Sequence, residues 1–179
     1  MEAFKFLINT GFNLFLMVVI LRFWLQLARA DFYNPFSQFV VKATNPIVLP
    51  LRRLIPSIGS LDTATLLLAY LVALTKLLLL QFIIIKAVLL PNTLWWAVLV
   101  LVKETFSLLF WILVIRALLS WFSQGSNPIE QVMHQLTEPL LRPIRRVLPP
   151  MGGLDLSVLV VLIGLQFLNI LVSDWLRGF

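Results

Sequence analysis

Four long apolar runs dominate the chain and limit what it can fold into. They cover Lys5–Ala28, Thr63–Leu90, Leu94–Phe122 and Leu156–Leu176. As α-helices rising about 1.5 Å per residue, all four are long enough to cross roughly 30 Å of hydrocarbon, some with tilt. Because 60% of the residues are hydrophobic and 12% are charged, the sequence predicts an all-α integral membrane protein with four transmembrane helices. The same composition argues against a soluble enzyme or a nucleic-acid-binding domain.

The first apolar run resembles a secretory signal peptide in part. Lys5 precedes it, and Ala28-Arg29-Ala30 imitates a cleavage site before Asp31. However, the stretch from Phe6 to Leu27 is longer than the usual apolar core of about 7–15 residues. We therefore interpret it as a retained membrane helix.

Two segments rich in proline and arginine recur at an offset of 93 residues. They are TNPIVLPLRRLIP, Thr44 to Pro56, and TEPLLRPIRRVLP, Thr137 to Pro149. Each half of the chain reads as a span, a long connector and a second span, with connectors at 29–62 and 123–155. Because each half contains an even number of spans, both halves must face the same way. The pattern predicts two parallel repeats, residues 1–90 and 91–179, with a short turn at Pro91-Asn92 between the inner spans.

The connectors show the periodicity of short helices that lie on the membrane surface. Apolar residues at i, i+3, i+4 and i+7, such as Phe36, Phe39, Val40 and Ala43, indicate one amphipathic helix. A second short helix is predicted to begin at the N-cap Asn45 with Pro46 in its first turn. The same arrangement is expected in the second connector. Asp62 and Asp155 are predicted N-caps of the spans that follow.

Paired arginines end both connector motifs, and they are candidate ligands for anionic lipid headgroups. They are Arg52, Arg53, Arg145 and Arg146. Arginines beside membrane spans also act as topology anchors, so both roles are open at this stage. Seven basic residues lie in or near the connectors and three on the opposite side, a bias that predicts cytoplasmic connectors and external termini.

Polar residues inside the spans form a second candidate site. Depth arithmetic places Lys76, Lys103, Glu104, Asn169 and Asn13 at similar levels, nearer the outer face than the connectors. Such residues are costly in lipid unless they are paired or hydrated. A static helix-packing network and a hydrated ion or proton path are both compatible with the sequence. Lys76 and Glu104 are predicted to form a buried pair.

The connector motifs resemble those of the YggT (YlmG) family of bacterial and plastid membrane proteins. The residues that carry the resemblance are Asn34, Thr44-Asn45-Pro46, Pro50-Leu51-Arg52-Arg53-Leu54-Ile55-Pro56 and Gly59-Ser60-Leu61-Asp62, with a second copy from Asn127 to Asp155. The resemblance covers nearly the whole chain and implies a multi-pass protein of the bacterial inner membrane. It also implies links to osmotic-stress tolerance or to division and nucleoid organisation, and a plastid branch is linked to haem attachment.

Motifs for catalysis, metal binding or cofactor binding are lacking in the sequence. There is no cysteine, and the single histidine, His134, falls on a predicted amphipathic helix. We therefore expect no metal and no cofactor. The sequence predicts a non-enzymatic membrane scaffold, or an assembly or stress-tolerance factor, that binds anionic lipid. Its alternative is a small channel or transporter component that uses the polar layer. Other membrane proteins and a second copy of the chain stay open as partners, and direct contact with nucleic acid is not expected.

Overall fold

The chain is almost entirely helical in the computed structural model, which describes residues 2–86, 90–122, 127–148 and 155–177. The helices are α1 (Glu2–Leu27), α2 (Pro35–Leu54), α3 (Thr63–Ile85), α4 (Leu90–Phe122), α5 (Pro128–Val147) and α6 (Leu156–Arg177). Beyond the helices, the described part of the chain holds one isolated bridge, between Ile58 and Leu61. The prediction of an all-α protein is confirmed.

Four of these helices are long and apolar enough to cross a membrane. They are α1, α3, α4 and α6, with 26, 23, 33 and 22 residues. Their positions agree with the four predicted spans. The number of spans was predictable because each run is apolar on all sides, as expected of a helix surrounded by lipid and other helices.

The predicted boundary between the second and third spans is wrong by several residues. Helix α3 ends at Ile85, followed by Lys86 in the left-handed conformation with φ 51°. Helix α4 already begins at Leu90, so Pro91 lies in its first turn and not in a separate turn with Asn92. Proline is well tolerated there, because the first N–H groups of a helix have no partner within the helix.

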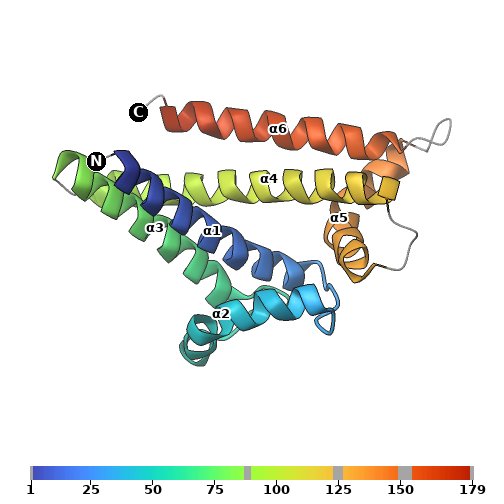
Figure 1. Cartoon of the computed structure of the whole chain (residues 1–179), viewed down its shortest axis with the longest axis horizontal. Helices are drawn as coiled ribbons and strands as arrows, with labels where there is room; N and C mark the ends of the chain where they lie inside the picture. Colours follow the sequence, from blue (N-terminus) through green and yellow to red (C-terminus); the bar gives the residue numbers. More distant parts are fainter. Residues whose placement is uncertain (1, 87–89, 123–126, 149–154, 178–179) are drawn as a thin grey trace.

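Both connector helices lie at the same end of the molecule. Figure 1 shows the start of α1, the end of α3, the start of α4 and the end of α6 toward one end, and α2 and α5 toward the other. Helix α1 packs against α3 in the first half, and α4 packs against α6 in the second, while α4 also contacts α3 and α1. Each half therefore has the same order of span, connector helix and span.

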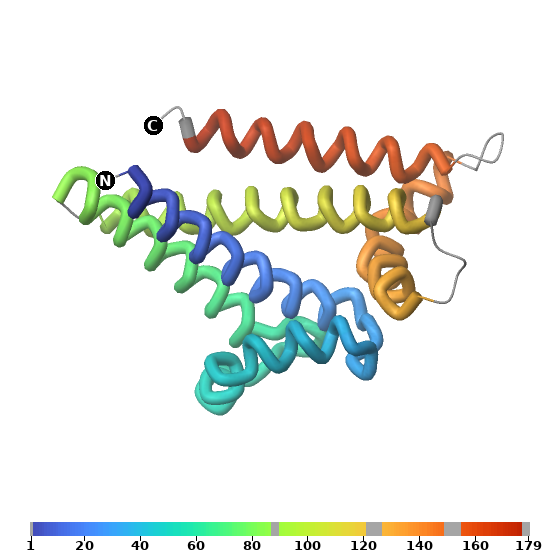
Figure 2. The backbone as a smooth tube through the Cα atoms, in the orientation of Figure 1, coloured from blue at the N-terminus to red at the C-terminus, as the bar shows by residue number. Residues whose placement is uncertain are grey.

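Each connector forms one bent helix and not the two short helices predicted. Asn34 caps α2 by accepting a hydrogen bond from Phe36 N (3.0 Å), and Asn127 caps α5 through Ile129 N (2.9 Å). Asn45, the predicted cap, lies inside α2. Interior prolines remove backbone donors and bend a helix without necessarily ending it. Figure 2 shows both connector helices changing direction along their length.

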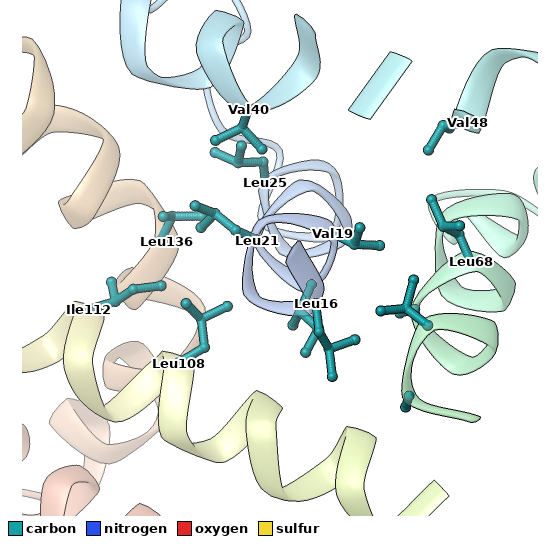
Figure 3. Close-up of a cluster of buried hydrophobic side chains, with 14 of the residues drawn as sticks. Leu16, Val19, Leu21, Leu25, Val40, Val48, Leu68, Leu108, Ile112 and Leu136 are labelled. Atoms are coloured by element: carbon teal, nitrogen blue, oxygen red, sulfur yellow. The ribbon is translucent and has the colours of Figure 1, made fainter. Parts of the chain in front are cut away.

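The main hydrophobic core lies around the second half of α1. Leu16, Val19 and Leu25 are fully buried there. Figure 3 shows that they meet side chains from every neighbouring helix, including Val40 and Val48 of α2, Leu68 of α3, Leu108 and Ile112 of α4, and Leu136 of α5. A smaller cluster holds α4, α5 and α6 together through Leu109, Leu113, Leu141 and Leu165. The connector helices are thereby fixed against the ends of the spans.

Candidate anion-binding face of the connector helices

Arg52, in the last turn of α2, is held inside the first half by an ion pair that the sequence did not reveal. Its Nη2 lies 2.5 Å from Asp62 Oδ2, and its Nε donates to Asp62 Oδ1 at 3.3 Å. Nη2 also donates to Gln26 Oε1 of α1 at 2.7 Å. One guanidinium therefore links α1, α2 and the start of α3. A planar, bidentate contact of this kind is geometrically specific as well as favourable.

Asp62 has two structural roles at the start of α3. Its side chain is fully buried, and it caps the helix by accepting hydrogen bonds from the backbone N–H (3.3 Å) and the hydroxyl of Thr65. Burial alone raises the pKa of this carboxyl. Hydrogen bonds from Arg52 and Thr65 outweigh that effect, so that the pKa of Asp62 lies below its ordinary value. The carboxylate is therefore charged and satisfied within the fold.

The second half repeats this contact in a more exposed form. Arg145 Nη2 donates to Asp155 Oδ2 at 2.6 Å, and Nη1 donates to Glu138 at 3.1 Å. Asp155 accepts a hydrogen bond from Ser157 N at 3.1 Å. Burial raises the pKa of Asp155, but hydrogen bonds from Ser157 and Arg145 bring it below its ordinary value. The bond to Asp155 in turn raises the pKa of Arg145.

The adjacent arginine of each pair has a different environment. Arg53 and Arg146 are exposed, and within the described part of the chain neither makes an ion pair or a hydrogen bond. Lys42 of α2 and Arg142 of α5 are exposed in the same two helices. We call these four cations, Lys42, Arg53, Arg142 and Arg146, the connector face. The sequence predicted equal roles for both arginines of a pair, whereas the structure separates them.

Arg22 and Arg116 make structural contacts to which the sequence prediction gave no role. Arg22 is buried and donates to Thr44 Oγ1 (2.6 Å), Asn45 Oδ1 (2.8 Å) and the Val41 carbonyl (3.1 Å). Arg116 donates to Thr137 Oγ1 in the equivalent place. Both contacts join a span to the middle of a connector helix, close to its interior prolines. The available signal was the matched occurrence of an arginine and a threonine in each half.

The intramembrane polar residues pair within each half, and the predicted Lys76–Glu104 ion pair is not present. Lys76 is buried and donates to Asn13 Oδ1 at 2.5 Å. Asn169 donates to the carbonyl of Lys103 at 3.3 Å. Glu104 is half-buried and makes no hydrogen bond or ion pair with a described residue, although it lies close enough for its charge to act on Lys76. The sequence did not determine the direction in which each side chain points.

His134 lies on the exposed side of α5. Its Nε2 is 3.8 Å from Glu138 Oε2, beside a shallow hollow of about 390 Å³ that Arg142 also lines. Among the described residues, no group of three or more histidine, aspartate or glutamate side chains is arranged to hold a metal ion. The contact is therefore an ordinary exposed pair on a helix surface.

Comparison with known proteins agrees with this architecture of span and proline-bent connector. The CCB3/YggT family model matches residues 1–83 and 95–176. The chain belongs to the CCB3/YggT family. A protein of this family from Escherichia coli strain K12, described as uncharacterized protein YggT, is 47% identical over 99% of this chain and 93% of its own length.

Other relatives extend the CCB3/YggT family match. A Vibrio alginolyticus protein, described as an uncharacterized protein in the proC 3' region, is 57% identical over 97% of this chain and 95% of its own length. The chloroplastic YlmG homolog protein 2 of Arabidopsis thaliana is 39% identical over 31% of this chain and 22% of its own. No solved structure matches the chain. The family match agrees with a protein that acts at a membrane.

Proposed function

We propose that the protein is a non-enzymatic membrane scaffold, acting in assembly or stress tolerance, whose connector face binds anionic phospholipid headgroups. In this proposal residues 1–90 and 91–179 are two parallel repeats of a multi-pass protein of the bacterial inner membrane. Their connectors face the cytoplasm, where anionic lipids attract basic segments. Arg53 and Arg146 provide the principal contacts, and Lys42 and Arg142 add positive charge.

The separation of the two arginines in each pair is the observation that carries the proposal. Arg52 and Arg145 already have carboxylate partners inside the protein, at 2.5 and 2.6 Å. A phosphate group would have to compete with Asp62 or Asp155 for them. Arg53 and Arg146 have no such competitor among the described residues, and both side chains are exposed. An exposed guanidinium offers several donors in a planar arrangement that suits phosphate oxygens.

Exposed apolar side chains next to these cations support a position at the membrane surface. On α2, Leu49 and Leu54 lie close in sequence to Arg53 and are 51% and 79% exposed. On α5, Val147 adjoins Arg146 and is also exposed. An interfacial helix of this composition buries its apolar side chains at the boundary of the acyl chains and leaves its cations among the headgroups.

Lipid selectivity tests the proposal. The protein would be purified in mild detergent at low salt with equal amounts of phosphatidylglycerol and phosphatidylcholine, and the retained lipids counted by native mass spectrometry. Each cation near an anionic surface contributes about 1 kcal/mol. The double variant Arg53→Gln with Arg146→Gln should therefore lose up to about 2 kcal/mol of preference, roughly 30-fold in selectivity.

The matched control replaces the other arginine of each pair. Arg52→Gln with Arg145→Gln removes the same formal charge, but we expect a smaller loss of selectivity together with lower stability. Equal losses in the two double variants would refute the separation of roles. If the variant lacking all four arginines kept the lipid preference of the parent at low salt, the proposal of headgroup binding would fail.

A second candidate function, an ion or proton path, is favoured by Glu104. This half-buried carboxyl lies within α4, and no described residue is bonded to it. An ionisable residue at such a depth is typical of transport sites. Flux through reconstituted vesicles would decide: loss of a measurable proton or cation flux in Glu104→Gln would support transport. Absence of flux from the parent protein would favour the scaffold.

A further inference from the structure

The two halves contact each other through different surfaces. Near the connectors the first half uses Leu21 and Trp24 of α1, which we call surface A, while α3 also packs against α4. The second half uses Leu108 and Ile112 of α4 with Val132 and Leu136 of α5, which we call surface B. Trp24 Nε1 donates to the Leu136 carbonyl at 2.8 Å. In Figure 3, Leu136 lies directly beside Leu21, with Ile112 and Leu108 adjacent.

Each half also carries a counterpart of the surface that it does not use. Arg22 and Arg116 both bond the matching threonine of their connector, which fixes an offset of 94 residues between α1 and α4 and of 93 between α2 and α5. The counterpart of surface A on α4 is therefore Ile115 and Leu118. The counterpart of surface B in the first half is Leu14, Val18, Phe39 and Ala43.

Most of these counterparts are exposed, although Val18 is partly buried and packs against the core. Leu108 is 5% exposed, whereas its counterpart Leu14 is 58% exposed. Val132 is fully buried, whereas Phe39 is 66% exposed. On the other surface, Leu21 is buried, whereas Ile115 is 41% exposed. The chain thus has one occupied A–B contact and, for each surface, a counterpart with exposed apolar side chains.

A polar contact at the connectors follows the same rule. Asn34 Nδ2 donates to the Pro128 carbonyl at 2.7 Å, which joins the first half to the second. The counterparts are Asn127 and Pro35. Asn127 uses its side-chain oxygen to cap α5, and its amide nitrogen donates to no described residue. Pro35 is exposed at the start of α2. Within the described residues, the side-chain amide of Asn127 and the exposed first turn of α2 at Pro35 therefore have no counterpart of this contact between the halves.

We propose that a second copy of this chain docks on these free surfaces, with the α4 surface of one copy against the α1–α2 surface of the other. The contact repeats the apolar part of the one near the connectors that joins the two halves of a single chain. The Trp24 hydrogen bond has no copy, because the counterpart of Trp24 is Leu118. Because the surfaces differ, the association is head-to-tail and produces either a closed ring or an open row of subunits. It is weaker than the internal contact, since the halves of one chain are held at high effective concentration. The proposal goes beyond lipid binding and does not depend on it.

Cysteine crosslinking in membrane vesicles tests the arrangement, because the chain has no cysteine of its own. Leu136 and Leu21 are neighbours inside one chain, and their counterparts are Ala43 and Ile115. We expect Ala43→Cys alone and Ile115→Cys alone to give little disulfide-linked dimer on mild oxidation. Vesicles containing both single variants should give several times more, because only a mixture brings the two thiols together.

The control uses a cysteine that is similarly exposed and at a similar depth in the membrane, but that the proposed contact does not place beside Ile115. Leu66 of α3 is 42% exposed and lies near the connector end of its span. A mixture of Leu66→Cys with Ile115→Cys reports random encounters in the membrane. If the Ala43→Cys and Ile115→Cys mixture gives no more dimer than this control, lipid covers the surfaces and the proposal is overturned. Efficient crosslinking of Ala43→Cys with itself would also overturn it, because that requires a symmetrical contact.

Discussion

Breaking the Arg52–Asp62 pair should destabilise the protein more than breaking its counterpart in the second half. The Asp62 side chain is fully buried and that of Arg52 is 34% exposed, whereas Arg145 and Asp155 are 31% and 37% exposed. Stranding one member of a fully buried pair costs about 3–5 kcal/mol. Since Arg52 remains partly solvated, we expect a coupling energy of about 2 kcal/mol for the first pair. For the more exposed Arg145–Asp155 pair we expect roughly 1 kcal/mol or less.

Two double-mutant cycles measure these coupling energies. One combines Arg52→Gln with Asp62→Asn, and the other combines Arg145→Gln with Asp155→Asn. Reversible unfolding in mixed micelles of mild detergent and dodecyl sulfate gives the free energy of unfolding for each variant. A coupling energy in the second half equal to or larger than that in the first would show that burial of Asp62 does not set the strength of the contact.

Further outcomes follow from the same contacts. Because the pKa of Asp62 is lowered in the folded protein, the charged Asp62 side chain stabilises the fold fully above the ordinary pKa of 3.8. This contribution to the free energy of unfolding is lost as the pH falls through the lower pKa of the folded state. Acid unfolding followed by circular dichroism should show the loss in the parent protein and not in Asp62→Asn. Arg22→Gln should destabilise the protein more than Arg116→Gln, by about 1–3 kcal/mol. The reason is that Arg22 donates to three acceptors, which the variant would leave buried without a partner. Equal shifts in melting temperature for the two variants would contradict this. Asn13→Leu should cost more than Lys76→Met, since it leaves a buried ammonium without its acceptor, and the double variant should cost less than the sum; additive melting shifts would show that the two groups do not interact. Impermeant thiol reagents should label Gln38→Cys and Gln131→Cys from the same side of the membrane, and labelling from opposite sides would refute parallel repeats.

The number and type of spans were predictable because hydrophobicity alone decides them. A run such as Leu156–Leu176 has no stable alternative to a helix within lipid. The connectors were harder to predict. Proline is a local signal for a helix break, whereas the continuity of a helix also depends on how it packs against other helices. Pro46 and Pro50 suggested a break, but packing of Val40, Thr44 and Val48 against α1 and α3 keeps α2 in one piece. Tertiary contacts therefore overrode the local preference.

The candidate site was predictable in composition but not in pairing. The sequence identified Arg52, Arg53 and Asp62 and placed Asp62 at a helix start. It did not show that α2 ends beside the start of α3, which is what brings Arg52 to Asp62 and leaves Arg53 outside. Likewise, the common depth of Lys76 and Glu104 did not determine their facing, because a rotation of about 100° per residue separates neighbours on a helix.

A structure of the protein in a lipid nanodisc that contains phosphatidylglycerol tests the division of the paired arginines most directly. We predict phosphate density within hydrogen-bonding distance of Arg53 and Arg146, while Arg52 and Arg145 remain bonded to Asp62 and Asp155. Phosphate density at Arg52 and Arg145, with their aspartates released and with Arg53 and Arg146 free of lipid, would contradict the account.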